Sequence, residues 1–501
     1  MTRLLSNIMG IVPENIQRSD LIHYITENSL RRVTFHYAGL DGKIKDLIIP
    51  LHSREYAERI LSAGERVDGS SLFKGMVPAT GSDLYVVPLY ASAFINPFDP
   101  ESLDFMCRFI DRNYSLTRFC PDNILHHIYH KLKHDYQYEL WAHGELEFYL
   151  LGEDESHFYK AQPQSGYHAS SPFSPYQTIL REMVQTTSDI TGLVKYGHSE
   201  VGMIPHLESS CKELDGKYAV QYEIEMLPAP VERAADAMLL AKWVVRNIAS
   251  KNNLLATFAP KIADGNAGTG MHFHLELIRD GVNQIRSGDG LSKVAKQCIG
   301  GLCEHAGTLS AFGNTIPSSY FRLVPHQEAP TQIFWSDLNR SALIRVPLGW
   351  PQGEDMAPFV NKQLKEHYRT KYIRQTFELR SPDGSAFIHL LLAGVAKIIY
   401  NTFSDPEKYT DIAERRYIKP GSDSSNAEIK SLPKTCWEAA EYLNSDRAIF
   451  RETFPEEVLD WVIKYLKDFS DKDLLNKLSE LSPKEETTRC LEIMHEYFHI
   501  Q

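Results

Sequence analysis

The sequence predicts an α+β fold with a small N-terminal domain over residues 20–115 and a large domain over residues 120–501. Two patterns carry this prediction. The first part is typical of a small sheet with helices, and the second alternates long amphipathic helices with strands before a helical C-terminal tail. A chain of 501 residues is long enough for more than one domain.

In the N-terminal part, the pattern predicts a short helix over residues 20–30. A strand from Arg32 then runs into a turn at Asp41-Gly42, and residues 44–51 form the return strand. An amphipathic helix over residues 55–63 and short strands to about residue 90 complete this region.

In the large domain, hydrophobic residues recur at three- and four-residue spacing, as at Met238, Leu239, Trp243 and Ile248. This spacing predicts helices near residues 122–134, 174–190, 232–251, 290–312 and 386–402. Residues 404–434 are polar and contain Pro and Gly, which predicts a long loop.

Five short segments with a strand pattern place acidic or basic residues two positions apart. Side chains at this spacing point to the same face of a strand, so neighbouring strands would form one concave, charged wall. Buried charges of one sign require counter-ions, and divalent cations and a charged substrate meet that need. The segments are Glu145-Leu146-Glu147, His198-Ser199-Glu200, Glu223-Ile224-Glu225, His272-Phe273-His274 and Glu378-Leu379-Arg380.

Each motif has an alternative interpretation when it is taken alone. Glu145 and Glu147 could lie on an exposed strand face, although apolar neighbours indicate a buried strand. His272 and His274 could be core histidines or half of a zinc site, but carboxylate-rich partners favour Mg²⁺ or Mn²⁺. The run from Gly265 to Gly270 is either a plain turn or a backbone segment that approaches a ligand closely.

Composition excludes several classes of function. The net charge of −12, without a basic run, argues against nucleic-acid binding. The seven scattered cysteines are typical of reduced thiols rather than a disulfide framework. No secretory signal and no apolar run of about 18 residues is present, so we expect a cytoplasmic protein without a membrane span.

Seven segments in order resemble glutamine synthetase, most closely the bacterial dodecameric type, over about residues 30–450. The resemblance rests on the residues of these motifs and on their order along the chain. They are Val67-Asp68-Gly69-Ser70-Ser71, residues 144–148, residues 270–274, residues 319–325, Glu328-Ala329-Pro330, residues 339–345 and residues 378–383.

The resemblance implies an N-terminal β-grasp domain and a catalytic domain whose antiparallel half-barrel sheet is backed by helices. It implies a homo-oligomer, a dodecamer of two hexameric rings, with glutamate, ammonium and ATP as substrates. It also implies two or more Mg²⁺ or Mn²⁺ ions per site. One ion would be held by Glu147, Glu200 and Glu223, and another by Glu145, His272 and Glu378.

The same resemblance implies roles for other residues. Arg340 and Arg345, with His274, would bind ATP and neutralise the transferred phosphoryl group. Gly268, Arg322 and Arg380 would bind glutamate. Asp68, from a neighbouring subunit, would bind and deprotonate ammonium, and Glu328 would shield the intermediate from water.

The chain departs from the family pattern at several positions. Ala267 replaces the usual Asn, Glu276 replaces a usual Ser, and Thr376 replaces a phosphate-binding Arg, for which Arg374 could substitute. An extra stretch spans about residues 347–370, and residues 404–434 do not match the family's adenylylation segment. These departures affect substrate and nucleotide contacts and leave the six candidate metal ligands in place.

Three functions therefore remain open from the sequence. The first is ligation of ammonium to glutamate through γ-glutamyl phosphate, favoured by Asp68. The second is a γ-glutamylamide ligase that uses an organic amine, favoured by Ala267. The third is a non-catalytic structural or regulatory homologue, against which the complete ligand set argues.

Overall fold

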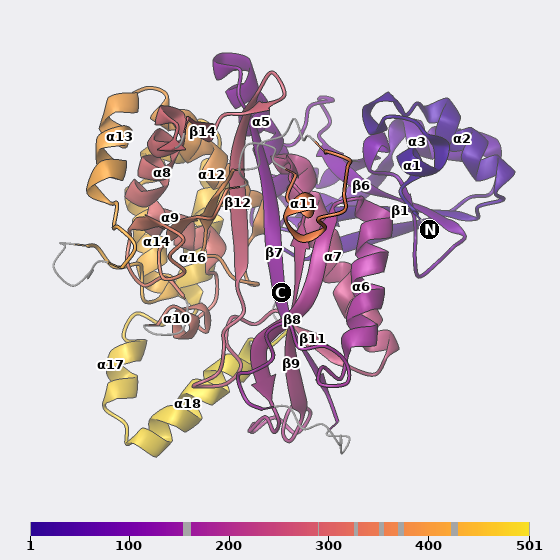
Figure 1. Cartoon of the computed structure of the whole chain (residues 1–501). Helices are drawn as coiled ribbons and strands as arrows, with labels where there is room; N and C mark the ends of the chain where they lie inside the picture. Colours follow the sequence, from indigo (N-terminus) through magenta and orange to yellow (C-terminus); the bar gives the residue numbers. More distant parts are fainter. Residues whose placement is uncertain are drawn as a thin grey trace.

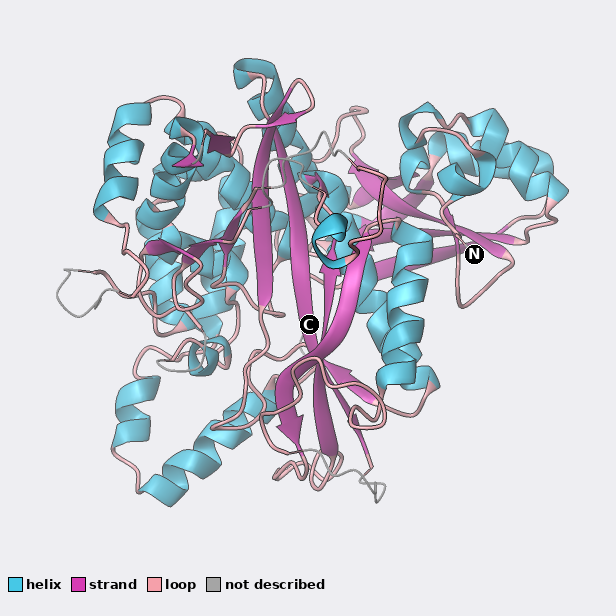
Figure 2. Cartoon of the chain, viewed as in Figure 1, coloured by secondary structure: helices cyan, strands magenta, loops and turns pink. Residues whose placement is uncertain are grey.

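The computed structural model describes residues 2–153, 162–288, 290–324, 329–349, 355–368, 375–421 and 429–499. A small N-terminal sheet domain lies beside a larger domain of long strands and helices (Figure 1). In the larger domain, helices lie against the long strands (Figure 2). The predicted α+β fold is confirmed.

The N-terminal sheet has the strand order β2-β1-β6-β4-β3, and β5 pairs with β6. β1 and β6 run parallel, and the other pairs are antiparallel. The predicted hairpin turns at Gly42, whose φ of 75° suits glycine. The bounds are β1 (Arg32–Ala38), β2 (Ile44–Pro50), β3 (Glu65–Asp68), β4 (Asp83–Pro88), β5 (Phe94–Ile95), β6 (Ser102–Ile110), α1 (Leu5–Met9), α2 (Arg18–Glu27), α3 (Arg54–Ala63), α4 (Gly69–Leu72), η1 (Pro13–Asn15), η2 (Ala79–Gly81) and η3 (Tyr90–Ser92).

The large sheet has the order β16-β17-β18-β12-β7-β9-β8, with β10 and β11 also on β7 and β13 on β12. The five strands that carry the charged pairs are therefore neighbours, in the order β18-β12-β7-β9-β8. All pairs among these five are antiparallel. The bounds are β7 (Glu139–Gly152), β8 (Val194–Ile204), β9 (Tyr218–Met226), β10 (Ala229–Pro230), β11 (Leu255–Thr257), β12 (Met271–Arg279), β13 (Val282–Asn283), β16 (Trp335–Asp337), β17 (Ile344–Val346) and β18 (Phe377–Leu379).

Helices cover the face of this sheet opposite to the charged pairs. Leu146, Ile224 and Phe273 alternate with the charged residues and are fully buried in one large apolar core. Gly144 allows α7 to approach β7, because a Cβ at this position would lie 2.5 Å from Met238 Sδ. The helices of this layer and its surroundings are α5 (Pro121–Tyr136), α6 (Gln177–Thr191), α7 (Val231–Lys251), α8 (Lys293–Glu304), α9 (Ala306–Gly313) and α12 (Ile388–Thr402).

Two predictions in the large domain were wrong. The helix expected over residues 290–312 is two helices, α8 and α9, which meet at His305. The loop expected over residues 404–434 contains α13 (Pro406–Arg415). The Asp405 side chain accepts a hydrogen bond from Lys408 N, and Pro406 occupies the first turn, so an N-capping signal was present in the sequence.

The C-terminal tail is helical, as predicted, and α17 and α18 extend along the lower edge of the view in Figure 1. The Thr257 hydroxyl donates to Phe498 O at 2.6 Å and ties the end of the tail to the large domain. None of the described helices is long and apolar enough to span a bilayer, and all seven cysteines are free thiols. The remaining elements are β14 (Arg286–Ser287), β15 (Gly290–Leu291), α10 (Ser319–Arg322), α11 (Ala357–Val360), α14 (Cys436–Ser445), α15 (Arg447–Phe450), α16 (Glu456–Asp468), α17 (Leu474–Ser479) and α18 (Pro483–Glu496).

Candidate functional site

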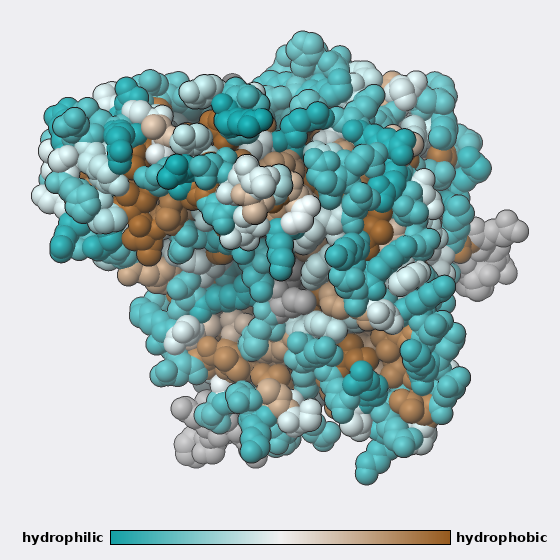
Figure 3. Space-filling view, turned by 180° about the vertical axis from the view of Figure 1, so that it is seen from behind, coloured by the Kyte–Doolittle hydropathy of each residue, from teal (hydrophilic) through white to brown (hydrophobic). Residues whose placement is uncertain are grey.

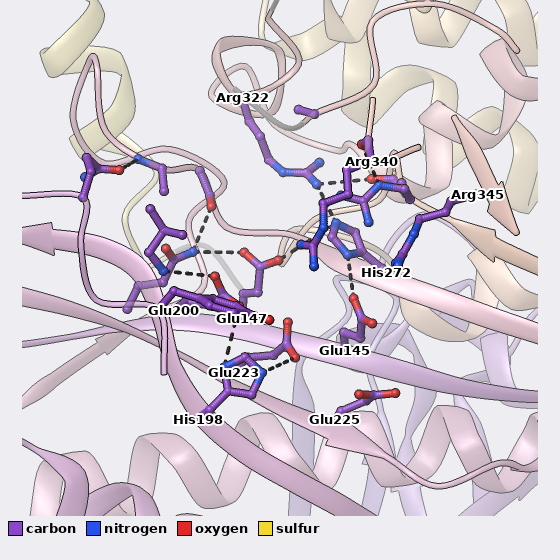
Figure 4. Close-up of a pocket in the computed structure, with 18 of the residues that line it drawn as sticks. Glu145, Glu147, His198, Glu200, Glu223, Glu225, His272, Arg322, Arg340 and Arg345 are labelled. Carbon is purple, nitrogen blue, oxygen red and sulfur yellow. Dashed lines mark hydrogen bonds and ion pairs between the residues drawn. The ribbon is translucent and has the colours of Figure 1, made fainter. Parts of the chain in front are cut away.

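A cavity of about 460 Å³ lies over the charged face of the large sheet. It is lined by strands β7, β8, β9 and β12, by the loop at residues 265–268, and by four arginines from the chain beyond residue 320. Figure 4 shows the acids on the sheet and Arg322, Arg340 and Arg345 grouped at one end of the cavity. A volume of this size is typical of small-molecule sites.

The strand register places the charged residues in one continuous row. His272 lies opposite Glu145, which lies opposite Glu225 on the other side of β7. Glu147 lies opposite Glu223, which in turn lies opposite His198. The spacing of two residues within a strand and the register between strands therefore act together to concentrate charge on one face.

One end of this row contains Glu145, His272 and Glu378, which we call the compensated group. The Glu145 carboxylate contacts His272 Nδ1 at 2.8 Å and His274 Nε2 at 2.9 Å. Burial acts to raise the pKa of Glu145, but the two histidine hydrogen bonds outweigh it, and the pKa lies well below its usual range.

Glu378 is the most enclosed member of the compensated group, with no exposed side-chain surface. Its two oxygens accept hydrogen bonds from Arg345 at 2.9 Å and Arg380 at 2.5 Å. Burial acts to raise the pKa of Glu378, but the charge of Arg380 reverses the effect and lowers it. The carboxylate is thus held ionised by the protein itself.

The other end contains His198, Glu200 and Glu223, which we call the uncompensated group. His198 lies 3.2 Å from Glu223 and 3.7 Å from Glu200. Burial, followed by the charges of Glu147 and Glu223, raises the pKa of Glu200 to about 8. Burial and neighbouring carboxylates also raise the pKa of Glu223. Like charges accumulate here, and no ion pair of Glu200 or Glu223 with a lysine or arginine occurs among the described residues.

Glu147 lies between the two groups. One of its oxygens accepts hydrogen bonds from Gln221 Nε2 at 3.0 Å and from Gly270 N at 2.9 Å. The other lies 4.0 Å from His272 Nε2. A Cβ at Gly270 would lie 2.5 Å from His272 and 3.0 Å from the Glu147 carboxylate. The backbone of the glycine-rich run therefore passes so close to His272 and Glu147 that a side chain at Gly270 would not fit.

The arginines make one end of the cavity cationic. Arg322 is buried, and its guanidinium donates to Ser381 O at 2.9 Å and to Arg380 O at 3.2 Å. Burial lowers the pKa of Arg322. Arg345 Nε is buried and has no hydrogen-bond partner within the described part of the chain. A donor of this kind next to a cavity suits an anionic ligand such as a phosphate or carboxylate.

The donor sets fit divalent cations. The ligand atoms of Glu145, His272 and Glu378 lie within 4.8 Å of one another, as do those of His198, Glu200 and Glu223. Carboxylates with a single histidine are ligands that suit Mg²⁺ and Mn²⁺. The raised pKa of Glu200 also shows a local excess of negative charge that a cation would relieve.

Eleven of the predicted site residues line this cavity. Glu378 is not a lining residue, but its carboxylate accepts a hydrogen bond from Arg345, which does line the cavity. Asp68 does not line it: this residue is exposed on β3 of the N-terminal sheet, and Ser70 and Ser71 hydrogen bonds lower its pKa to about 2. Glu328 and Arg374 lie outside the described residues. The eleven are Glu145, Glu147, Glu200, Glu223, Gly268, His272, His274, Arg322, Arg340, Arg345 and Arg380.

The departures from the family pattern have structural consequences. Thr376 Oγ1 lies 2.8 Å from His274 Nδ1, so both ring nitrogens of His274 are engaged. Burial acts against protonation of His274, but Glu145 raises its pKa. Ala267 lines the cavity, and its backbone bonds to Tyr149 and Gln164 at 2.9 Å each. Glu276 is buried and accepts from Asn283 at 2.7 Å.

Sequence reasoning missed Gln221, Tyr196 and Lys195. Gln221 precedes Glu223 by two residues on β9, and Tyr196 precedes His198 by two on β8, so the same periodicity could have found both. Lys195 Nζ bonds to Glu225 at 2.7 Å. No pattern indicates Lys195, because the pairing of β8 with β9 is irregular between Val194 and Tyr196.

Comparison with known proteins gives consistent results. Residues 118–472 match the family described as "Glutamine synthetase, catalytic domain", and residues 29–112 match "Glutamine synthetase, beta-Grasp domain". The chain is 27% identical to the glutamine synthetase of Sulfolobus acidocaldarius over 499 residues, which cover 91% of this chain and 95% of the relative. It is 29% identical to that of Pyrococcus furiosus over 429 residues, covering 84% and 87%.

Solved structures share the fold at lower identity. The glutamine synthetase of Plasmodium falciparum superposes with a TM-score of 0.72 at 20% identity, covering 94% of this chain and 98% of that one. A structure described as a GmaS/ADP complex gives a TM-score of 0.70 at 20% identity, covering 93% and 98%. With its charged wall, its half-barrel sheet and matches over both domains, this chain belongs to the glutamine synthetase family of ATP-dependent ligases.

Proposed function

We propose that the protein joins ammonium to glutamate at the expense of ATP, through a γ-glutamyl phosphate intermediate. The observation that carries this proposal is the arrangement of opposite charges around one cavity: a row of carboxylates on the sheet faces a group of arginines. Such a site can bind cations, a nucleotide phosphate and an acidic substrate at the same time.

Two Mg²⁺ or Mn²⁺ ions would occupy the two groups. Glu145, His272 and Glu378 would hold one ion, and Glu147, Glu200 and Glu223 would hold the other, with His198 beside them. Such ions supply charge stabilisation for the phosphates and the acidic substrate. This assignment is supported by the convergence of Glu145, His272 and Glu378 and of His198, Glu200 and Glu223. The raised pKa of Glu200, to which the charge of Glu147 contributes, indicates an excess of negative charge.

The first chemical step needs a cationic environment that excludes water. A γ-carboxylate oxygen of glutamate attacks the γ-phosphorus of ATP, the bond to the bridging oxygen breaks, and ADP leaves. Arg340 and Arg345 would neutralise the transferred phosphoryl group. This role is supported by Arg345 Nε, which is buried and has no hydrogen-bond partner among the described residues. Gly268, Arg322 and Arg380 would position glutamate.

The second step needs a base for ammonium. Ammonia attacks the acyl carbon, and inorganic phosphate leaves with the electrons of the C–O bond. Asp68 from a neighbouring copy would bind ammonium and take its proton, and its lowered pKa keeps it anionic. Glu328, which lies outside the described residues, would close over the intermediate.

This use of Asp68 requires an oligomer, because the residue does not line the cavity of its own chain. We propose a ring assembly of two hexamers that places the N-terminal domain of one copy against the cavity of the next. Apolar side chains on the N-terminal domain support such a contact, since Ile48 is 59% exposed, Tyr85 42% and Tyr114 92%. Seen from behind, this domain has a hydrophobic patch (Figure 3).

A second candidate function is ligation of an organic amine in place of ammonium. The observation that favours it is Ala267, whose small side chain leaves the cavity wall open where the family usually carries Asn. A neighbour of the same fold, GmaS, binds ADP, so nucleotide binding is compatible with either amine.

Phosphate release from ATP distinguishes these functions. The assay would contain glutamate with either ammonium or a panel that includes methylamine and ethanolamine. We expect the highest kcat/KM with ammonium, and a clearly higher value for any primary amine would replace the first proposal with the second.

Asp68→Asn should lower the turnover with ammonium far more than it weakens the binding of ATP. Light scattering tests the assembly, because a fully active species of single-chain mass would exclude a shared site.

A further inference from the structure

A second group of ligating side chains lies between α5 and α7, separate from the cavity. His126 and His130 are one helical turn apart on α5, and Glu232 is in the first turn of α7. Side chains four residues apart on a helix lie on the same face, so both imidazoles point toward α7. None of the three residues lines the cavity described above.

One measured distance equals the separation expected between two ligands of a bound transition metal, and the other is shorter, at hydrogen-bond length. His126 Nδ1 lies 2.8 Å from Glu232 Oε1, and His130 Nε2 lies 3.4 Å from Glu232 Oε2. Two ligands that each lie about 2.1 Å from a tetrahedral ion are about 3.4 Å apart. The ligand atoms of all three side chains lie within 4.8 Å of one another, and the imidazole rings are 4.2 Å apart. Only small side-chain movements are therefore needed to admit an ion.

The surroundings leave the group open to solvent and free of strong competition. The side chains of His126 and His130 are 40% and 52% exposed, so an ion and its water ligands can enter. The guanidinium of Arg108 interacts electrostatically with Glu232, but it bonds to Asp236 at 2.9 Å and lies 3.4 Å from Asp122. Its charge is therefore largely balanced by two buried carboxylates.

We propose that His126, His130 and Glu232 form a binding site for one divalent transition-metal ion of the Zn²⁺ class. Two imidazoles and a carboxylate leave one tetrahedral position for water, and this donor set prefers Zn²⁺ to Mg²⁺, because imidazole nitrogen is a poor ligand for Mg²⁺. The ion would link α5 to the start of α7, next to the Arg108–Asp236 ion pair that joins the N-terminal sheet to α7.

Zn²⁺ titration of the full-length protein by calorimetry, with Mg²⁺ in excess, tests the site. We expect the His126→Ala/His130→Ala double variant to bind one equivalent of Zn²⁺ less than the wild type, and Glu232→Gln to bind that equivalent more weakly. The matched control is His127→Ala, an exposed histidine on the same helix outside the group. Equal Zn²⁺ stoichiometry in the wild type and the double variant would overturn the proposal.

A second measurement uses only the wild-type protein and does not depend on how the variants fold. Diethyl pyrocarbonate modifies accessible, uncoordinated imidazoles, and mass spectrometry locates each modified residue. Zn²⁺ should slow modification of His126 and His130 and leave His127 unchanged. Equal rates for His126 and His130 with and without Zn²⁺ would also overturn the proposal. Both readouts are independent of ligase activity, so they do not depend on the proposed function.

Discussion

The two ends of the charged wall solve the same electrostatic problem in different ways. In the compensated group, Glu378 is completely buried but receives two arginines, and Glu145 receives two histidines. In the uncompensated group, Glu200 and Glu223 have one histidine between them, and both carboxylates have raised pKa values. At the first end, protein side chains neutralise the carboxylates. At the second end, neutralisation depends on a proton or a cation from solution.

The two ends therefore separate carboxylates whose charge stabilises the fold from carboxylates whose charge a ligand would neutralise. A buried ion pair that loses one partner leaves the other charge exposed to a low dielectric, which is costly. A carboxylate crowded by like charges is costly while it stays ionised, and its removal relieves the fold.

Metal removal should affect function most. We expect excess EDTA to abolish ligase activity and Mg²⁺ or Mn²⁺ to restore it, because His198 is the only potentially cationic side chain that pairs with the uncompensated carboxylates in the described part of the chain. Glu147→Ala and Glu378→Ala should each abolish turnover, measured as phosphate release. Circular dichroism would show whether each variant keeps the fold. Full activity in excess EDTA would contradict the assignment of this wall as a metal site.

Substitutions at the two ends should change stability with opposite sign. In the metal-free protein near pH 8, Glu378→Gln should lower the free energy of unfolding by about 3–5 kcal/mol, because it removes the charged partner of the buried Arg380 and of the partly buried Arg345. Glu200→Gln should leave it unchanged or raise it, because it removes one of several like charges. Urea denaturation of both variants in EDTA measures this difference, and equal losses would show that the two ends are not distinct.

The pH dependence of stability should follow Glu200. Its pKa is raised from 4.5 to about 8, so the folded protein retains a proton that the unfolded chain releases. The free energy of unfolding of the metal-free protein should therefore fall as the pH rises through this window. Thermal melts in EDTA at a series of pH values measure the slope.

Two controls sharpen this test. Glu200→Gln should flatten the slope, because the amide does not titrate. Saturating Mg²⁺ should also flatten it at the alkaline end, since the ion replaces the proton, and metal affinity should increase with pH up to about 8. A slope that survives in Glu200→Gln would assign the titration to another group.

The smallest effect is expected at Lys195. Its ammonium group bonds to the buried Glu225 but is 37% exposed itself, so water can partly replace it. Lys195→Met should lower the free energy of unfolding by about 1 kcal/mol, and Lys195→Arg should preserve the pair. Urea denaturation measures both. A loss as large as that of Glu378→Gln would mean that Glu225 belongs to the compensated end.

Much of the wall could be predicted because its chemistry follows strand periodicity. The pairs at Glu145/Glu147 and His272/His274 needed only the two-residue repeat, and the structure places all five paired segments on adjacent strands. The order β18-β12-β7-β9-β8 could not be derived in this way, because periodicity contains no information about which strands are neighbours.

Other features depended on tertiary contacts. The break between α8 and α9 occurs at His305, which bonds to Asp446 at 2.9 Å, a partner 141 residues away. Thr376, which replaces an expected arginine, fixes the His274 ring through a contact between β12 and the start of β18. The α13 helix was different, since its capping residue Asp405 could have been recognised from sequence.

The register of β7 with its neighbours also protects the chain from misfolding. A slip of one residue would turn Glu145 and Glu147 toward the helices and bring Leu146 into the cavity. The misaligned sheet would bury its carboxylates against Met238 and the apolar core, where no cation can reach them. The acids that are proposed to bind metal in the native protein therefore also raise the free energy of a wrongly paired sheet. A variant without them would lose this energetic preference for the correct register.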